Sequence, residues 1–169
     1  MFYNAKKFSV ITVLMIVLAT QSVPSNAKDN LPGQTEPLST DELWQIYHNR
    51  TWQWTDGAGY FANKGRNFTA YSARGRNANF AEGTWFIPRE GRVCFRADWV
   101  GVYGSVPKTT CFDHRKDGRN VYQRRLPSGK WYVFKHTPLK NWDEFRKLLP
   151  RDYVSSGLER NRRAIKRHQ

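Results

Sequence analysis

The sequence predicts a mainly β fold, an antiparallel meander of about eight strands, from three observations. Short apolar segments alternate with glycine-containing turns between residues 51 and 136, 15% of the 169 residues are aromatic, and the two cysteines fall in neighbouring segments. Segments joined by short turns pair with their sequence neighbours, and a meander hides its edges by closing into a barrel. We therefore expect one domain, an up-and-down, lipocalin-like barrel. A two-layer sandwich with helices on one face is the alternative.

Residues 1–27 have the pattern of an export signal. Lys6 and Lys7 precede an uninterrupted apolar stretch at 8–20, and small residues at positions 25 and 27 suit a signal peptidase. A membrane anchor, the alternative, needs about 20 apolar residues, which is more than this stretch offers. We expect cleavage after Ala27, and no membrane span in the rest of the chain.

The next two segments predict a leader and a helix. Residues 28–38 contain two prolines, a glycine and little apolar content, which is typical of a flexible leader. Ser39 and Glu42 then have the spacing of a capping box, and apolar residues follow at helical intervals. We expect a short helix over about 40–49, and we place the barrel domain at 39–150.

Glycine-containing turns delimit the expected strands, because they supply the positive φ that reversals favour. The segment 131–134 is apolar on both faces, so we expect a helix over about 141–149 to cover it. A basic tail at 151–169 follows, with a second capping box and with Leu158 and Ile165 on one side of a short helix. The expected strands are 51–55, 58–62, 67–72, 81–87, 92–100, 107–115, 119–126 and 130–136.

The cysteines predict the register of two central strands. Apolar residues occupy the odd positions of 93–99, so Cys94 points away from the core. Cys111 also precedes a phenylalanine, and pairing it with Cys94 puts the reversal near 102–103, where a turn is already indicated. In an oxidising compartment we expect a disulfide that stabilises the fold by about 3 kcal/mol. A metal site is disfavoured, because no third cysteine exists and His114 would face inward.

Few residues are candidates for catalysis. Asp113 and His114 with Glu82 or Asp98, or His136 at the end of the last strand, would be the starting point for acid-base chemistry. Neighbouring strand residues face opposite sides, and nothing in the sequence brings another carboxylate to either histidine. No nucleophile elbow, phosphate-binding loop or zinc-protease motif occurs. We assign no catalytic residue, metal or cofactor, and an envelope hydrolase is the least favoured function.

Positive charge is the main functional clue. Lys and Arg number 28 against 14 Asp and Glu. An exported protein rarely meets nucleic acid, so acidic polysaccharide or anionic lipid headgroups are the expected partners. A charged tail that only maintains solubility is the alternative. The anion-binding candidates are Arg115, Lys116, Arg119, Arg124, Arg125, Arg160, Arg162, Arg163, Lys166 and Arg167.

The aromatic residues of the strands suggest another function. Residues such as Trp52, Trp54, Trp85 and Trp99 would either fill the core or line a ligand cavity, because an eight-stranded barrel accommodates either arrangement. The leading hypothesis is a non-enzymatic exported protein whose cationic surface binds anionic envelope material. A lipocalin-like carrier of a small apolar ligand is the alternative.

Several motifs also resemble a known family, and they lie at 51–61, 83–85, 94–95, 111–118, 122–125 and 131–136. The sequence is similar to domain-of-unknown-function family 995, exported proteins of rhizobia and related alphaproteobacteria, over about residues 38–150. The resemblance implies a bacterial periplasmic or secreted setting, and it implies no substrate, cofactor or catalytic residue.

Overall fold

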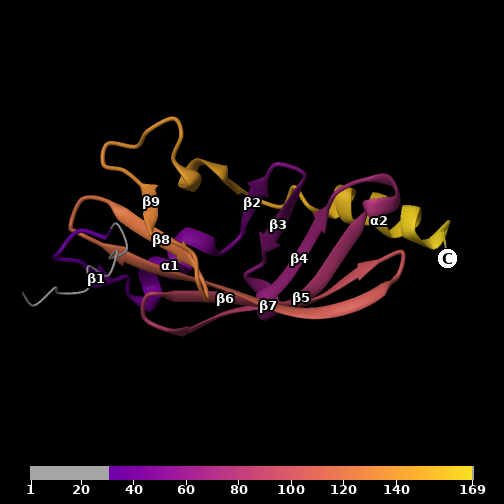
Figure 1. The fold of residues 1–169 in the computed structure, drawn as a ribbon, viewed down its shortest axis with the longest axis horizontal. Helices are drawn as coiled ribbons and strands as arrows, with labels where there is room; N and C mark the ends of the chain where they lie inside the picture. Colours follow the sequence, from indigo (N-terminus) through magenta and orange to yellow (C-terminus); the bar gives the residue numbers. More distant parts are fainter. Residues whose placement is uncertain (1–30, 169) are drawn as a thin grey trace, which may run out of the picture.

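Ten antiparallel strands form one sheet, curled into a half-barrel, in the computed structural model, which describes residues 31–168 (Figure 1). The sheet order is β10-β2-β3-β4-β5-β6-β7-β8-β9, and β1 pairs with β7. The predicted meander is confirmed, whereas the export signal at 1–27 lies outside the described residues. The strands are β1 (Glu36–Pro37), β2 (Arg50–Trp54), β3 (Gly57–Phe61), β4 (Asn67–Ser72), β5 (Asn79–Arg89), β6 (Arg92–Gly101), β7 (Gly104–Lys116), β8 (Val121–Arg125), β9 (Tyr132–Lys135) and β10 (Leu148–Pro150).

Each expected strand corresponds to one of β2 to β9, and turn glycines mark several of the reversals. Gly91 and Gly118 have φ values of 70° and 84°, a left-handed conformation that glycine adopts without steric cost. Strands β1 and β10 come from segments that were expected to be leader and helix. Leu38, the last leader residue, is buried in the main core.

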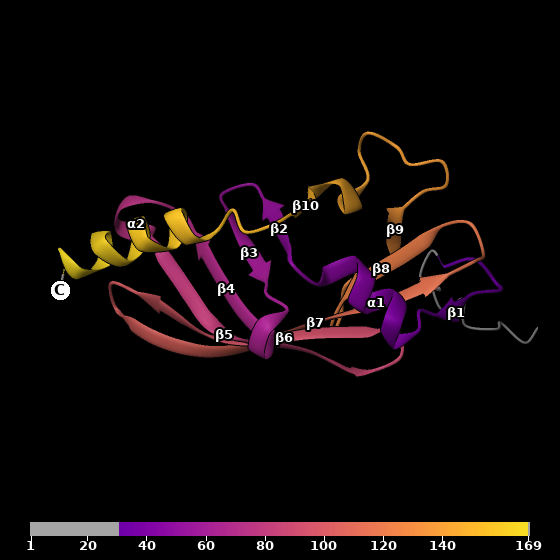
Figure 2. The same cartoon turned by 180° about the vertical axis from the view of Figure 1, so that it is seen from behind.

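Helix α1 (Thr40–Tyr47) begins at the predicted capping box. The Ser39 hydroxyl accepts a hydrogen bond from the Glu42 N–H, and the Glu42 carboxylate accepts one from the Ser39 N–H. Leu43 and Tyr47 are completely buried in the main core. Figure 2 shows α1 beside β8, at the end of the molecule opposite helix α2 (Ser155–Lys166). Helix α1 therefore fills one end of the half-barrel.

The prediction of a helix over 141–149 is wrong. A 3₁₀ turn, η3 (Glu144–Lys147), leads directly into β10, which pairs with β2. Pairing with the edge of β2 satisfies backbone groups on both strands, and a three-residue strand leaves no length for a helix. Phe145 does pack against Phe134 of the last strand, with ring centroids 5.8 Å apart, but Trp142 is 75% exposed.

Helix α2 confirms the predicted tail helix, with Leu158 and Ile165 buried. They pack with Ala58 and Phe80 of the sheet in a second core. The side-chain nitrogen of Asn161 lies 3.0 to 3.1 Å from three backbone carbonyls at the two ends of the β4–β5 connection. Asp152, rather than the predicted capping box, accepts hydrogen bonds from the first N–H groups. Helix α2 therefore belongs to the folded domain.

The predicted disulfide and its register are confirmed. Cys94 and Cys111 are paired residues of β6 and β7 with Cα atoms 4.1 Å apart, and their sulfurs are bonded. The register ends at Gly101 and Gly104, so the reversal lies at 102–103 as expected. None of the helices in residues 31–168 combines the length and apolar character of a membrane span.

Candidate functional site

A groove of about 850 Å³ opens on the concave face of the half-barrel, at the end away from α1. Its walls come from β2, β6, β7 and the β4–β5 connection. A cavity of this volume with mainly apolar walls is typical of a small-molecule site. The apolar side chains of the lining include Trp52, Trp54, Phe95, Trp99, Val106 and Phe112.

Strand register explains which side chains face the groove. Trp99 pairs with Val106 and Phe95 with Thr110, so these residues share the inner face of β6 and β7. Between them on the same face Ala97 is opposite Lys108. Neighbouring inward positions hold alanines and glycines, such as Ala81 of β5, which is paired with Trp99. Small side chains across the sheet leave this end of the concave face unfilled.

Two indole N–H groups of the groove are hydrogen-bonded within the protein. Trp52 Nε1 donates to Glu144 Oε1 at 2.8 Å, and Trp54 Nε1 donates to Ser72 Oγ at 3.4 Å. Glu144 also forms an ion pair with Lys147 at 2.6 Å. These bonds fix the rings by their polar edges; the Trp52 ring is otherwise packed against Phe112 and Phe134, whereas Trp54 is half-buried.

Cations outnumber acids along the groove. Arg76, Lys108 and Arg125 belong to the lining, and Glu144 is the only carboxylate among the lining residues. Within residues 31–168, none of the three cations donates a side-chain hydrogen bond or forms an ion pair. The groove therefore combines aromatic walls with uncompensated positive charge.

A buried polar cluster occupies the other end of the half-barrel, which α1 fills. His114 is completely buried, and its Nε2 lies 2.8 Å from both the Tyr47 hydroxyl and the Gln123 side-chain nitrogen. The Tyr132 hydroxyl donates to Gln123 Oε1. Burial lowers the pKa of His114 to about 3, so its imidazole is neutral at physiological pH. Asp113 points the other way, as expected, and forms an ion pair with Arg92 at 2.6 Å.

One histidine does have a carboxylate partner that the sequence did not reveal. His136 Nδ1 lies 2.5 Å from Asp143 Oδ1, and the second carboxylate oxygen accepts the N–H groups of His136 and Lys140. The only sequence signal is an acid seven residues downstream, in a segment expected to be helical. Neither His136 nor Asp143 lines the groove, so this pair organises the loop before η3 and suggests no chemistry there.

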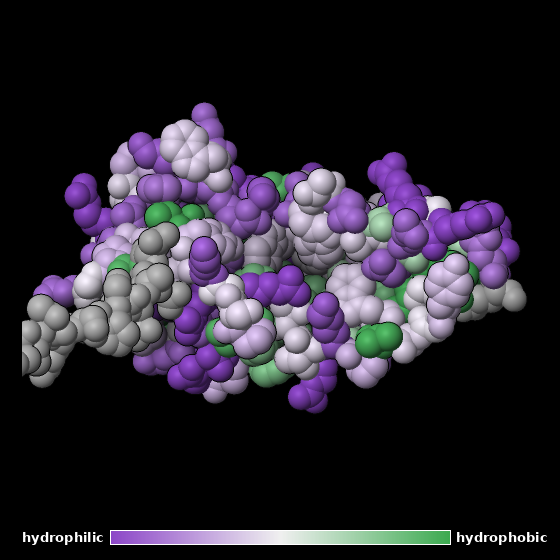
Figure 3. Space-filling model, viewed as in Figure 1, coloured by the Kyte–Doolittle hydropathy of each residue, from purple (hydrophilic) through white to green (hydrophobic). Residues whose placement is uncertain are grey.

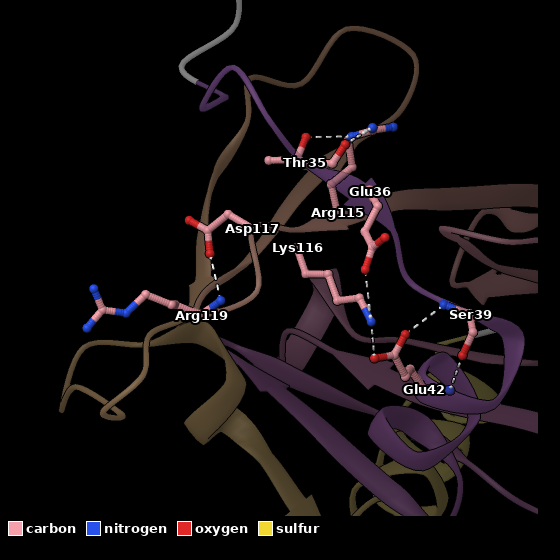
Figure 4. A network of polar contacts seen from close by, with 8 residues as sticks. All are labelled: Thr35, Glu36, Ser39, Glu42, Arg115, Lys116, Asp117 and Arg119. Atoms are coloured by element: carbon pink, nitrogen blue, oxygen red, sulfur yellow. Dashed lines mark hydrogen bonds and ion pairs between the residues drawn. The ribbon is translucent and has the colours of Figure 1, made fainter.

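Two of the predicted anion-binding residues fasten the N-terminal segment to β7 (Figure 4). Arg115 donates to the side chain and carbonyl of Thr35, and Lys116 pairs with Glu36 at 3.4 Å and Glu42 at 2.6 Å. The hydrogen bond from Lys116 lowers the pKa of Glu42. These two cations are already neutralised or hydrogen-bonded, whereas the side chain of nearby Arg119 points away from the network.

The remaining candidates are spread over three places. Arg124 pairs with Asp113 at 3.4 Å and stacks on a tryptophan, and Arg125 reaches the groove. On α2, Arg160 covers a tyrosine ring and Arg162 pairs with Glu82 at 2.7 Å. Figure 3 shows hydrophilic side chains gathered over the end of the molecule that carries α2. In the described part of the chain, the exposed α2 cations without an ion pair are Arg160, Arg163 and Lys166, and Arg167, directly after the helix, has none either.

A family model described as a protein of unknown function, DUF995, matches residues 13–154. The chain belongs to the DUF995 family. This confirms the family resemblance of the sequence. No curated protein and no solved structure gives a match to this DUF995 protein. The groove and the exposed cations of α2 are therefore the features from which a function is argued.

Proposed function

We propose that this DUF995 protein is a non-enzymatic binding protein that holds a small, largely apolar ligand in the groove. The observation that carries the proposal is a cavity of about 850 Å³ whose apolar lining is dominated by aromatic side chains. Burying apolar surface contributes about 25 cal/mol per Å², so several aromatic contacts suffice for binding.

The framework around the groove supports a preformed site. The disulfide joins β6 and β7, which provide most of the inner wall, and hydrogen bonds position the rings of Trp52 and Trp54. A rigid site loses less conformational entropy when the ligand binds. The half-barrel thus has the arrangement expected of a carrier.

A neutral apolar fluorophore, phenylnaphthylamine, tests this function. We expect a saturable rise in probe emission with the purified, oxidised chain, and a loss of at least ten-fold in affinity for Trp99→Ala. Trp142→Ala is the matched control, because Trp142 is 75% exposed and lies outside the groove lining. Absence of saturable binding, or equal losses in both variants, would refute the proposal. Native mass spectrometry of freshly purified protein should reveal a bound species.

Binding of anionic envelope material, acidic polysaccharide or lipid headgroups, is the second candidate. It is favoured by Arg163, Lys166 and Arg167, which project from α2 without ion pairs among the described residues. Cations at this spacing bind dense negative charge in a salt-dependent manner. Retention on a heparin column should decrease in R163Q/K166Q/R167Q. The control K64Q/R89Q/R96Q removes the same charge from other exposed positions; equal elution of the two variants would argue against a site on α2.

We also propose that the protein is exported to the bacterial periplasm or secreted. The disulfide supports an oxidising compartment, and the pattern at 1–27 supports a cleaved signal. Mass spectrometry of protein from the envelope fraction should give an N-terminus at Lys28. A full-length chain in the cytoplasm would contradict this.

A further inference from the structure

Lys108 is one of the three cations in the groove lining. It faces inward from β7, opposite Ala97, with Val106 and Thr110 as its neighbours on the same face. Inward positions of a small barrel are usually apolar, but Lys108 is exposed at the open side of the groove, where its ammonium is hydrated. Lys108 has no acidic partner in residues 31–168. Its position therefore leaves room for an anion supplied by a ligand.

The surroundings of Lys108 favour an anionic partner over a neutral one. Arg76 and Arg125 add positive charge elsewhere in the lining, and the single carboxylate, Glu144, is engaged by Trp52 and Lys147. Attraction between unit charges is stronger near low-dielectric walls than in bulk water. All three cations are exposed and hydrated, and an anionic ligand adds a counter-charge that a neutral ligand does not supply.

Among the three cations Lys108 is best placed to bind a head group. Arg125 pairs with Phe112 in the sheet, and the ring of Phe112 lies 4.9 Å from that of Trp52, whose N–H is bound to Glu144. Arg125 therefore lies at the end of the groove that contains Glu144. Arg76 belongs to the β4–β5 connection outside the sheet. Lys108 shares the inner face with Phe95 and Trp99, which lie on either side of its partner Ala97, and it is not next to the acid.

We propose that the ligand of the groove is an amphiphile with an anionic head group, which Lys108 binds while aromatic rings cover the apolar part. This rests on the proposed carrier function and adds the ligand's chemical class. The Thr110 hydroxyl, two residues along the same face, is a second donor for the head group. Trp54, Phe95 and Trp99 provide the apolar contacts. Carboxylate, sulfonate and phosphate heads share the chemistry that this site recognises.

Two fluorophores that differ only in charge test the proposal. Anilinonaphthalene sulfonate has the aromatic skeleton of phenylnaphthylamine plus one sulfonate. We expect the wild type to bind the sulfonate more tightly, and K108M to weaken sulfonate binding roughly ten-fold and by a clearly larger factor than it changes neutral-probe affinity, as expected for a partly solvated charge pair. K108R should retain the preference for the sulfonate probe over the neutral one. K64M, at an exposed lysine outside the groove, is the matched control.

Further measurements separate this inference from its alternatives. R163Q/K166Q/R167Q should leave sulfonate affinity unchanged, because the head group binds in the groove rather than on α2. Dodecanoate should displace the neutral probe more effectively than dodecanol does. If K108M weakens both probes equally, or if the wild type shows no charge preference, the head-group assignment is wrong while the carrier function stands. If neither probe binds the wild type saturably, the carrier function itself fails and the assignment fails with it.

Discussion

The two ends of the half-barrel are built from the same strands and differ in how their concave faces are filled. Near α1, Tyr47, Phe61, Trp85 and Phe134 are at most 1% exposed and contact one another or neighbouring rings. Toward the β6–β7 hairpin the inner face opens into the groove, and Val106 is 65% exposed. The closed end has the packing of a core, and the open end has that of a binding site.

Two features account for this difference. Helix α1 inserts Leu43 and Tyr47 into the closed end, whereas no helix of residues 31–168 covers the inner face of the other. Helix α2 packs on the outer face there, with Ala58, Phe80 and Tyr71. Stability is thus concentrated at the α1 end, and the open end is free to bind a ligand without rearrangement of the core.

Trp85→Ala should produce the largest change in stability. Trp85 is completely buried at the closed end, and its N–H donates to the Ala62 carbonyl at 2.8 Å. Removal of the ring creates a cavity and leaves that carbonyl without its partner, so we expect a loss of about 3 to 5 kcal/mol. Urea unfolding followed by circular dichroism measures this loss in the free energy of unfolding. A loss below about 1 kcal/mol would show that the closed end is not the main core.

Loss of the disulfide should cause the next largest loss of stability, because Cys94 and Cys111 lie where the two ends meet. Their neighbours in the ladder are Val93 with Phe112 on one side and Phe95 with Thr110 on the other. We expect C94A/C111A to reduce the free energy of unfolding by about 3 kcal/mol, by the chain-entropy estimate for a 17-residue separation. Adding reductant to the wild type should reproduce the shift in urea midpoint, and adding it to the variant should have no effect.

The strands were predictable from sequence because alternation and turn glycines are local signals. Alternation also placed the cysteines in register and put His114 on the inner face. Strand β10 was not predictable, because its three residues depend on pairing with the edge of β2 rather than on their own pattern.

The groove could not be predicted from the sequence either. Trp85 and Trp99 both occupy inward positions of strands, yet one lies in the core and the other in the groove lining. Which role each has depends on where α1 packs and on small residues such as Ala97 in neighbouring strands. These are tertiary relationships that residue type and spacing do not encode.

Acid should destabilise the closed end through His114. The pKa of this buried imidazole is about 3 in the folded protein and about 6.5 in an unfolded chain. Between these values the unfolded chain binds more protons, so the free energy of unfolding falls as pH decreases below about 6.5. At pH 5 the loss is about 2 kcal/mol relative to pH 7. His114→Gln should flatten this dependence in urea titrations, whereas His168→Gln at the exposed C-terminal end should not.

Trp99→Ala should give the smallest change in stability, although it removes as large a ring as Trp85→Ala does. Trp99 is half-buried, with one side on the sheet and the other in the groove, so its removal enlarges an existing hollow instead of creating a cavity. We expect a loss of about 1 kcal/mol or less without ligand. Anilinonaphthalene sulfonate at a concentration that saturates the wild type should raise the melting temperature of the wild type more than that of Trp99→Ala, because ligand stabilisation depends on affinity for the folded state. Equal destabilisation by Trp85→Ala and Trp99→Ala would mean that the open end is as much a core as the closed one, and the division between them would no longer hold.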